Sequence, residues 1–140
     1  MTDAALAAHR AFYDAVETGD ADLMASLWAE GPDVSCVHPG GTPLRGTRTV
    51  LRSWTVLMAH VGYIQFFLTD IEQTAFPRGS ADPQTVVVTC TENILSGDGV
   101  AAVDFVGGKA VSTSVLVREG ATWKFWSRHA SPVAEIEETD

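Results

Sequence analysis

WKFWSRHASP, residues 123–132, is the last and most informative of several β-type runs in this chain. Side chains of a strand alternate between its two faces, so Trp123 and Phe125 are expected to share a face with His129 unless a bulge intervenes. Arg128 falls on the opposite face. The pattern therefore predicts an ionisable imidazole at the mouth of an apolar cavity, at the end of the final strand.

The composition predicts one globular domain that binds neither nucleic acid nor a membrane surface. The chain has 140 residues, of which 46% are hydrophobic and 19% charged, which is enough to build one core without disulfides or metals. A formal net charge of −9 is repelled by phosphate-rich partners. We expect the domain to cover residues 1–132 and an acidic, solvated tail to cover residues 133–140.

The sequence also predicts a cytoplasmic protein. Cys36 and Cys90 lie in separate apolar runs and are expected to be buried thiols in a reducing compartment, although a disulfide between them stays open. No apolar run approaches the roughly 18 residues typical of a membrane helix. The N-terminus lacks the basic region and apolar stretch of a secretory signal.

The first third of the chain predicts three helices. Apolar residues recur at helical spacing up to about Thr18, and Gly19 ends this segment. Asp20 can cap a second helix, which Gly31-Pro32 ends, and Thr47 can cap a third.

The rest of the chain is rich in β-branched and aromatic residues and predicts strands joined by short turns. Helices followed by such strands indicate an α+β fold in which three N-terminal helices pack on one side of a strongly bent, mostly antiparallel sheet. A bent sheet covered in this way encloses a conical space, where ligand pockets tend to form. The strand-like segments are residues 33–38, 63–76, 85–95, 100–106 with 110–117 (one strand with a glycine bulge, or two) and 123–132.

Six motifs in a fixed order along nearly the whole chain resemble the nuclear transport factor 2-like (NTF2-like) superfamily, and within it the SnoaL-like branch. The resemblance implies a cone-shaped α+β barrel, commonly a homodimer packed through its sheet. The motifs are Leu27-Trp28-Ala29, Val37-His38-Pro39-Gly40-Gly41, Leu44-Arg45-Gly46, Val50-Leu51-Arg52-Ser53-Trp54, Val88-Thr89-Cys90-Thr91-Glu92, and Trp123 with His129-Ala130-Ser131-Pro132.

Members of this superfamily include isomerases, polyketide cyclases, epoxide hydrolases and dehydratases, together with non-catalytic transport and association domains. Because one fold hosts many functions, the function has to be inferred from the residues of the site. The branch often carries more histidine in the final strand, where this chain has Ser127 and Arg128. An asparagine common on the preceding strand is replaced within Ser112-Thr113-Ser114.

Three ionisable side chains are candidates for acid/base catalysis: His38, Glu92 and His129. Each histidine can act as an acid, a base or a ligand anchor, or can instead be a structural group that satisfies a loop or a strand end. Glu92 shares a strand face with apolar residues, where a carboxylate is costly unless it is protonated or paired. The structural alternative is an ion pair with a base such as Arg45, Arg48 or Arg128.

Tyr13, Trp54, Phe67 and Ser114 are the candidate substrate-binding residues, because they combine apolar surface with polar atoms that need partners. A metal is disfavoured, since His38, Glu92 and His129 come from separate strands without a known ligand spacing.

The sequence therefore favours a cofactor-independent enzyme that performs isomerisation, cyclisation, dehydration or hydrolysis on a small, mostly apolar molecule. The alternative is a non-catalytic ligand-binding or dimerisation module.

Overall fold

The computed structural model describes residues 3–97 and 106–134 of the chain. Two expected features lie largely outside this range, namely the strand-like segment 100–106 and the acidic tail of residues 133–140. Within it the elements follow the order α1 (Asp3–Thr18), α2 (Ala21–Ser26), β1 (Ser35–Val37), β2 (Leu44–Arg45), α3 (Thr47–His60), β3 (Tyr63–Phe76), β4 (Thr85–Gly97), β5 (Val106–Glu119) and β6 (Thr122–Pro132).

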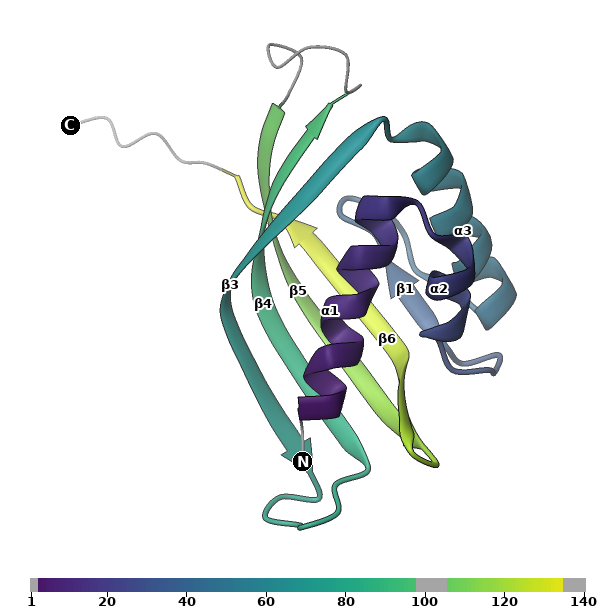
Figure 1. Ribbon diagram of the computed structural model, residues 1–140, viewed down its shortest axis with the longest axis vertical. Coiled ribbons are helices and arrows are strands. Elements are labelled where there is room, and N and C mark those ends of the chain that lie inside the picture. The colour runs from purple at the N-terminus through teal and green to yellow at the C-terminus, as the bar shows by residue number, and fades with distance from the viewer. Residues whose placement is uncertain (1–2, 98–105, 135–140) are drawn as a thin grey trace, which may run out of the picture.

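One open sheet forms the frame of the molecule. Its strand order is β2-β1-β6-β5-β4-β3, and every neighbouring pair is antiparallel except β1 and β6, which run parallel. The long strands curve around α1, which lies across the inner face, while α2 and α3 cover the end of the sheet near β1 (Figure 1). This confirms the α+β fold with three helices on one side of a bent, mostly antiparallel sheet.

The helix ends follow the local signals, with two exceptions. The second helix, α2, ends at Ser26 rather than at Gly31-Pro32, because Leu27 caps it and Trp28 pairs with Phe125 of β6. Gly19 ends α1 in a left-handed conformation with φ of 66°, and the Asp20 side chain caps α2 by accepting a hydrogen bond from Leu23 N at 3.0 Å. Thr47 does not cap α3 as expected, because Gly46 takes that position. Instead Thr47 Oγ1 donates to the carbonyl oxygen of Ala29 at 2.8 Å and ties α3 to the segment after α2.

A β-bulge in β6 decides which of its side chains enter the cone. The register of β6 against β5 shifts between Phe125 and Ser127, which leaves Trp126 as an extra residue. Beyond an extra residue the alternation of faces reverses. Arg128 is therefore buried on the inner face, and His129 is exposed on the outer one. The expectation that His129 shares a face with Phe125 is wrong for this reason.

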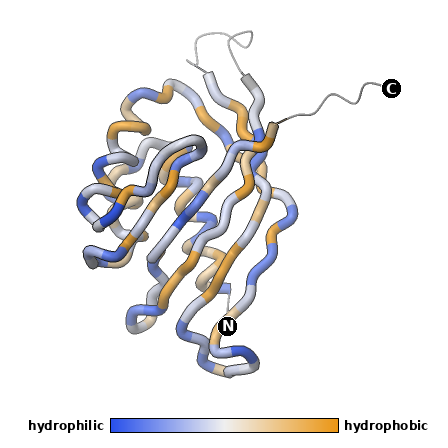
Figure 2. The backbone as a smooth tube through the Cα atoms, turned by 180° about the vertical axis from the view of Figure 1, so that it is seen from behind, coloured by the Kyte–Doolittle hydropathy of each residue, from blue (hydrophilic) through white to orange (hydrophobic). Residues whose placement is uncertain are grey.

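The two faces of β4 and β5 otherwise follow the predicted alternation. Glu92 is buried on the inner face with Val88 and Cys90, and Thr89 is exposed on the outer face. Viewed from the outer side, the long strands lie in front of α1 and carry both apolar and polar residues (Figure 2). In the described part of the chain, no helix combines the length and apolar character needed to cross a membrane.

Candidate functional site

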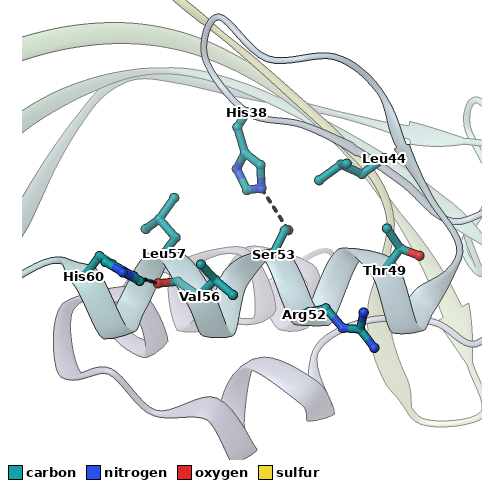
Figure 3. A pocket seen from close by; sticks show the side chains of 8 residues that line it. All are labelled: His38, Leu44, Thr49, Arg52, Ser53, Val56, Leu57 and His60. Atoms are coloured by element: carbon teal, nitrogen blue, oxygen red, sulfur yellow. Dashed lines mark hydrogen bonds between the residues drawn. The ribbon is translucent and has the colours of Figure 1, made fainter.

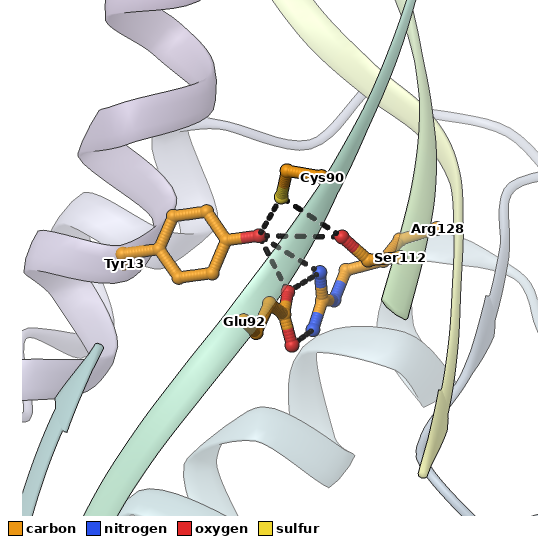
Figure 4. Close-up of polar contacts among 5 residues, drawn as sticks. All are labelled: Tyr13, Cys90, Glu92, Ser112 and Arg128. Carbon is orange, nitrogen blue, oxygen red and sulfur yellow. Dashed lines mark hydrogen bonds and ion pairs between the residues drawn. The ribbon is translucent and has the colours of Figure 1, made fainter. Parts of the chain in front are cut away.

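The inner face of the sheet holds a buried ion pair. Arg128 Nη1 donates to Glu92 Oε2 at 2.7 Å, and Arg128 Nη2 donates to Glu92 Oε1 at 3.2 Å (Figure 4). The Tyr13 hydroxyl, from α1, donates to the same Oε2 at 2.5 Å. Glu92 and Arg128 are only 1% and 3% exposed. The structural alternative foreseen for Glu92, an ion pair with Arg128, is therefore what the structure shows.

Aromatic rings surround the guanidinium group of Arg128. Its Cζ lies 4.5 Å from the centroid of the Phe12 ring and 5.8 Å from that of Trp54. A desolvated cation over an aromatic face gains cation–π attraction. The hydrogen bonds to Glu92 and these rings together offset the loss of hydration of the arginine.

The network fixes the protonation states of its members. Burial raises the pKa of Glu92, but the Arg128 charge and hydrogen bonds from Arg128, Tyr13 and Ser112 outweigh burial and hold that pKa below its ordinary value of 4.5. Burial raises the pKa of Tyr13, so its phenol stays protonated. At neutral pH both oxygens of the Glu92 carboxylate are engaged, and this arrangement makes Glu92 a poor general base.

Small polar groups extend the network along the inner face. Cys90 Sγ lies 3.6 Å from the Tyr13 hydroxyl and 3.3 Å from Ser112 Oγ. Both cysteines are buried free thiols, as expected from the sequence. Ser114 Oγ and His9 Nε2 are buried without a hydrogen-bond partner among the described residues. Tyr13 and Ser114 thus lie in the interior that the sequence predicted for them.

A separate groove lies against α3 and contains His38. Its volume is about 650 Å³ and its walls are mostly apolar (Figure 3). His38 follows β1 and its Nε2 lies 2.9 Å from the hydroxyl oxygen of Ser53 on α3. The lining residues are His38, Leu44, Thr49, Arg52, Ser53, Val56, Leu57 and His60.

The Ser53 hydroxyl decides which nitrogen of His38 carries the proton. Ser53 Oγ lies 2.6 Å from the carbonyl oxygen of Val50 and donates its single proton there. His38 Nε2 must then be protonated and donate to Ser53 Oγ. The lone pair of the neutral ring is left on Nδ1, which bonds to no described residue. Figure 3 shows this second nitrogen on the Leu57 side of the ring, away from Ser53.

His38 is held in its neutral form. Burial, and then the positive charge of Arg128, lower the pKa of His38 below its ordinary value of 6.5. Trp54 connects the two sites, because its ring packs edge-on to His38 at 4.5 Å and to Phe12 at 4.8 Å between centroids. Trp54 is therefore positioned by the interior and contributes to the surroundings of His38.

The structure does not bring the three expected catalytic groups together. Glu92 is sealed in the ion pair, His38 lies in the groove, and His129 lies on the outer face of the sheet. There His129 lines a second hollow of about 340 Å³ with Thr113 and Ser127. The expectation of one shared cavity for these groups is wrong. No cluster of three or more potential metal-ligating side chains occurs in the described ranges.

Phe67 is also placed differently from the expectation. It is 54% exposed, whereas its neighbour Phe66 is buried and packs against Tyr13 at 5.0 Å between ring centroids. The alternation of β3 therefore gives the interior position to Phe66, and the placement of Phe67 in the cavity is wrong.

The roles of Ser53 and His9 were not predicted from the sequence, which indicated Arg128 only as one of three possible partners of Glu92. Arg128 was assigned to the opposite strand face from Phe125, and only the bulge at Trp126 reverses that assignment. Ser53 had no histidine near it in sequence, because its partner lies 15 residues away. For His9 the sequence does contain a signal, because a histidine next to the apolar stripe of a helix can be buried with it.

Breaking the buried ion pair on one side is expected to destabilise the protein by about 3–5 kcal/mol, because an uncompensated charge then stays in the core. Urea unfolding of Arg128→Met and of Glu92→Met measures this loss. The double variant Glu92→Met/Arg128→Met removes both charges and should lose less than the sum of the single variants.

The exposed pair Arg118–Asp82 provides the control for the buried one. Arg118→Met is expected to change stability by at most about 1 kcal/mol. Additive losses in the double variant of the buried pair would show that Glu92 and Arg128 do not stabilise one another.

The buried His9 side chain is expected to lower the free energy of unfolding in mild acid. Burial, with the nearby Arg128 charge, lowers the pKa of His9 from 6.5 to about 4. Between these two values the unfolded chain binds a proton that the folded protein excludes, so stability falls as the pH falls. The expected loss between pH 7 and pH 5 is about 2 kcal/mol.

Urea unfolding at both pH values measures this loss, and His9→Phe should remove the greater part of it. His38, whose pKa is also lowered, contributes in the same direction and remains in the variant. Wild type and His9→Phe with equal pH dependence would refute the role given to His9.

The comparison with known proteins agrees with the fold. The SnoaL-like domain family model matches residues 5–135. An NTF2-like family protein from Streptomyces avermitilis, assigned as a candidate dehydratase, is 44% identical over 96% of each chain, with a TM-score of 0.82. No curated protein sequence matches the chain.

Two further solved structures have the same fold. A candidate calcium/calmodulin-dependent protein kinase type II association domain from Thiobacillus denitrificans is 27% identical, and the match covers 91% of this chain and 94% of that one with a TM-score of 0.74. An NTF2-like protein from Pseudomonas putida, 17% identical over 93% of this chain and 84% of its own, has a TM-score of 0.71. The chain belongs to the SnoaL-like family within the NTF2-like superfamily, as its sequence motifs predicted.

Proposed function

We propose that this protein performs acid/base chemistry on a small, mostly apolar molecule bound in the groove against α3. The observation that carries the proposal is the state of His38, which is neutral, donates from Nε2 to Ser53 and forms no hydrogen bond through its basic Nδ1 with any residue in the described part of the chain. A base of this kind at an apolar wall can remove a proton from a bound carbon acid.

Among the reactions that the sequence left open, dehydration has the most support. The relative from Streptomyces avermitilis that is 44% identical is assigned as a candidate dehydratase. In such a reaction His38 Nδ1 removes the C–H proton in a first step, and the electron pair of that bond stays on the substrate as a carbanion. In the second step the imidazolium protonates the hydroxyl on the neighbouring carbon as the C–O bond breaks, so that the double bond forms, water leaves and His38 is neutral again. This scheme requires no cofactor.

Trp54 is the proposed binding residue nearest to His38. Its ring forms an edge contact with the imidazole at 4.5 Å between centroids and is itself held by Phe12 and Arg128. Tyr13 and Ser114 lie deeper, and their proposed part in binding applies to a ligand that reaches the inner face. Glu92 acts in this scheme by holding Arg128 in place, and the charge of Arg128 adds to burial in lowering the pKa of His38.

His38→Gln tests the proposal. Glutamine can still donate to Ser53 but has no basic nitrogen, so turnover is expected to fall by a factor of roughly 10² or more while ligand affinity changes little. The ligand is first identified by native mass spectrometry of protein purified from its host, and the turnover of that molecule is then followed in both proteins.

The same assay on His129→Gln separates the two histidines. Turnover retained in His38→Gln and lost in His129→Gln would assign the chemistry to the outer face and contradict the proposal. A ligand that binds without turnover in the unaltered protein would favour the non-catalytic alternative.

The outer face of the sheet supports a second function, dimerisation. Phe67 and Val111 are about half exposed there, and apolar residues at such positions are typical of protein interfaces. We therefore propose that two copies of the chain pack through this face.

Val111→Glu is expected to convert the dimer to a monomer, because it buries a carboxylate at the contact. Sedimentation velocity measures the change. Val56→Glu, at a valine that is also about half exposed but lies on α3, is the matched control and should leave the dimer intact. A monomeric wild-type protein would exclude this contact.

A further inference from the structure

The charge of the groove differs from that of the rest of the molecule. The chain carries 18 acidic residues and a net charge of −9, yet none of the eight residues that line the groove is acidic. Arg52 is the one lining residue with a fixed charge, because His38 is held neutral. The groove is therefore locally cationic on an acidic protein.

Arg52 is available for a ligand. It is exposed, and it forms neither an ion pair nor a side-chain hydrogen bond with any residue in the described ranges. His60 lies about two turns further along α3. Its Nδ1 lies 2.8 Å from the carbonyl oxygen of Val56, so Nδ1 carries the proton and donates it to the backbone. Among the lining residues, Arg52 thus offers a free charged donor group, and the Thr49 hydroxyl is a further donor without a partner in the described ranges.

The other walls of the groove suit a hydrocarbon body. Leu44, Val56 and Leu57 contribute carbon surface, and Val56 is 53% exposed, so its methyl groups are accessible to a ligand. Figure 3 shows Arg52 and Ser53 on the same helix, with the Arg52 side chain extending away from His38. Both residues line the groove, so a ligand that contacts its apolar wall at Val56 can extend a charged end along α3 to Arg52.

From this arrangement we infer that the substrate of the groove is a small organic acid, an apolar body that carries one carboxylate, and that Arg52 binds the carboxylate. This inference rests on the proposed function for the groove and names its substrate class. The planar guanidinium fork matches a carboxylate with two parallel hydrogen bonds. The apolar body then lies against Val56 and Leu57, next to the basic nitrogen of His38.

A matched pair of probes tests the inference. 4-Phenylbutyrate and 4-phenylbutyramide share one apolar body and differ in charge. Their dissociation constants are measured at pH 7 by titration of the ¹⁵N-labelled protein, with the amide signals of α3 as the reporter. The acid is expected to bind about fivefold more tightly than the amide, a ratio that suits an exposed ion pair.

Two variants locate the source of this preference. Arg52→Gln should abolish it, while Arg48→Gln, which removes the same charge one turn earlier on α3 and outside the groove lining, should retain the greater part of it. Both positions are exposed, so the fold is expected to survive, and circular dichroism checks this.

Each other outcome contradicts a stated claim. Equal binding of acid and amide at the α3 signals overturns the carboxylate inference and leaves the proposed groove site standing. A preference for the acid that persists in Arg52→Gln also overturns the role of Arg52. Failure of both probes to shift the α3 signals overturns the inference together with the small-molecule site on which it rests.

Discussion

The pairing of Arg128 with Glu92 is the constraint on which the rest of the interior depends. Neither charge could remain on the inner face of the sheet alone, because the loss of hydration exceeds what packing can return. Their two hydrogen bonds join β6 to β4, and the Tyr13 hydroxyl joins the same carboxylate to α1. Three elements far apart in the sequence are thereby fixed in one geometry by directional contacts.

Because of this ion pair, the buried charges and the candidate base His38 lie in two separate parts of the protein. A carboxylate that is hydrogen-bonded on both oxygens by an arginine and a phenol, and whose pKa is lowered by them, is a poor proton acceptor, so its role is to position. The positive charge of Arg128 reaches further, since it also lowers the pKa of His38. Trp54, packed near both Arg128 and His38, separates the charged interior from the groove in which a base can act.

Local sequence signals predicted most of the architecture, because they depend on neighbours in the chain. The cap formed by Asp20 and the alternation of β4 around Glu92 follow from spacing alone. The bulge at Trp126 could not be predicted from spacing, because no residue type in β6 marks the position at which the extra residue is inserted. That single residue exchanged the faces of Arg128 and His129 and so changed the predicted site.

The remaining difference between sequence and structure concerns pairs of residues. Glu92 could be predicted to need a partner, but three arginines were available, and only the tertiary fold selects Arg128. The roles of His38 and Ser53 likewise depend on their contact, since the serine sets the tautomer of the histidine. The chemistry of this chain therefore resides in contacts between elements, and the elements themselves are what its sequence specifies most directly. A relative that keeps Glu92 and Arg128 but lacks His38 would retain the cone, because the interior pair does not require the groove.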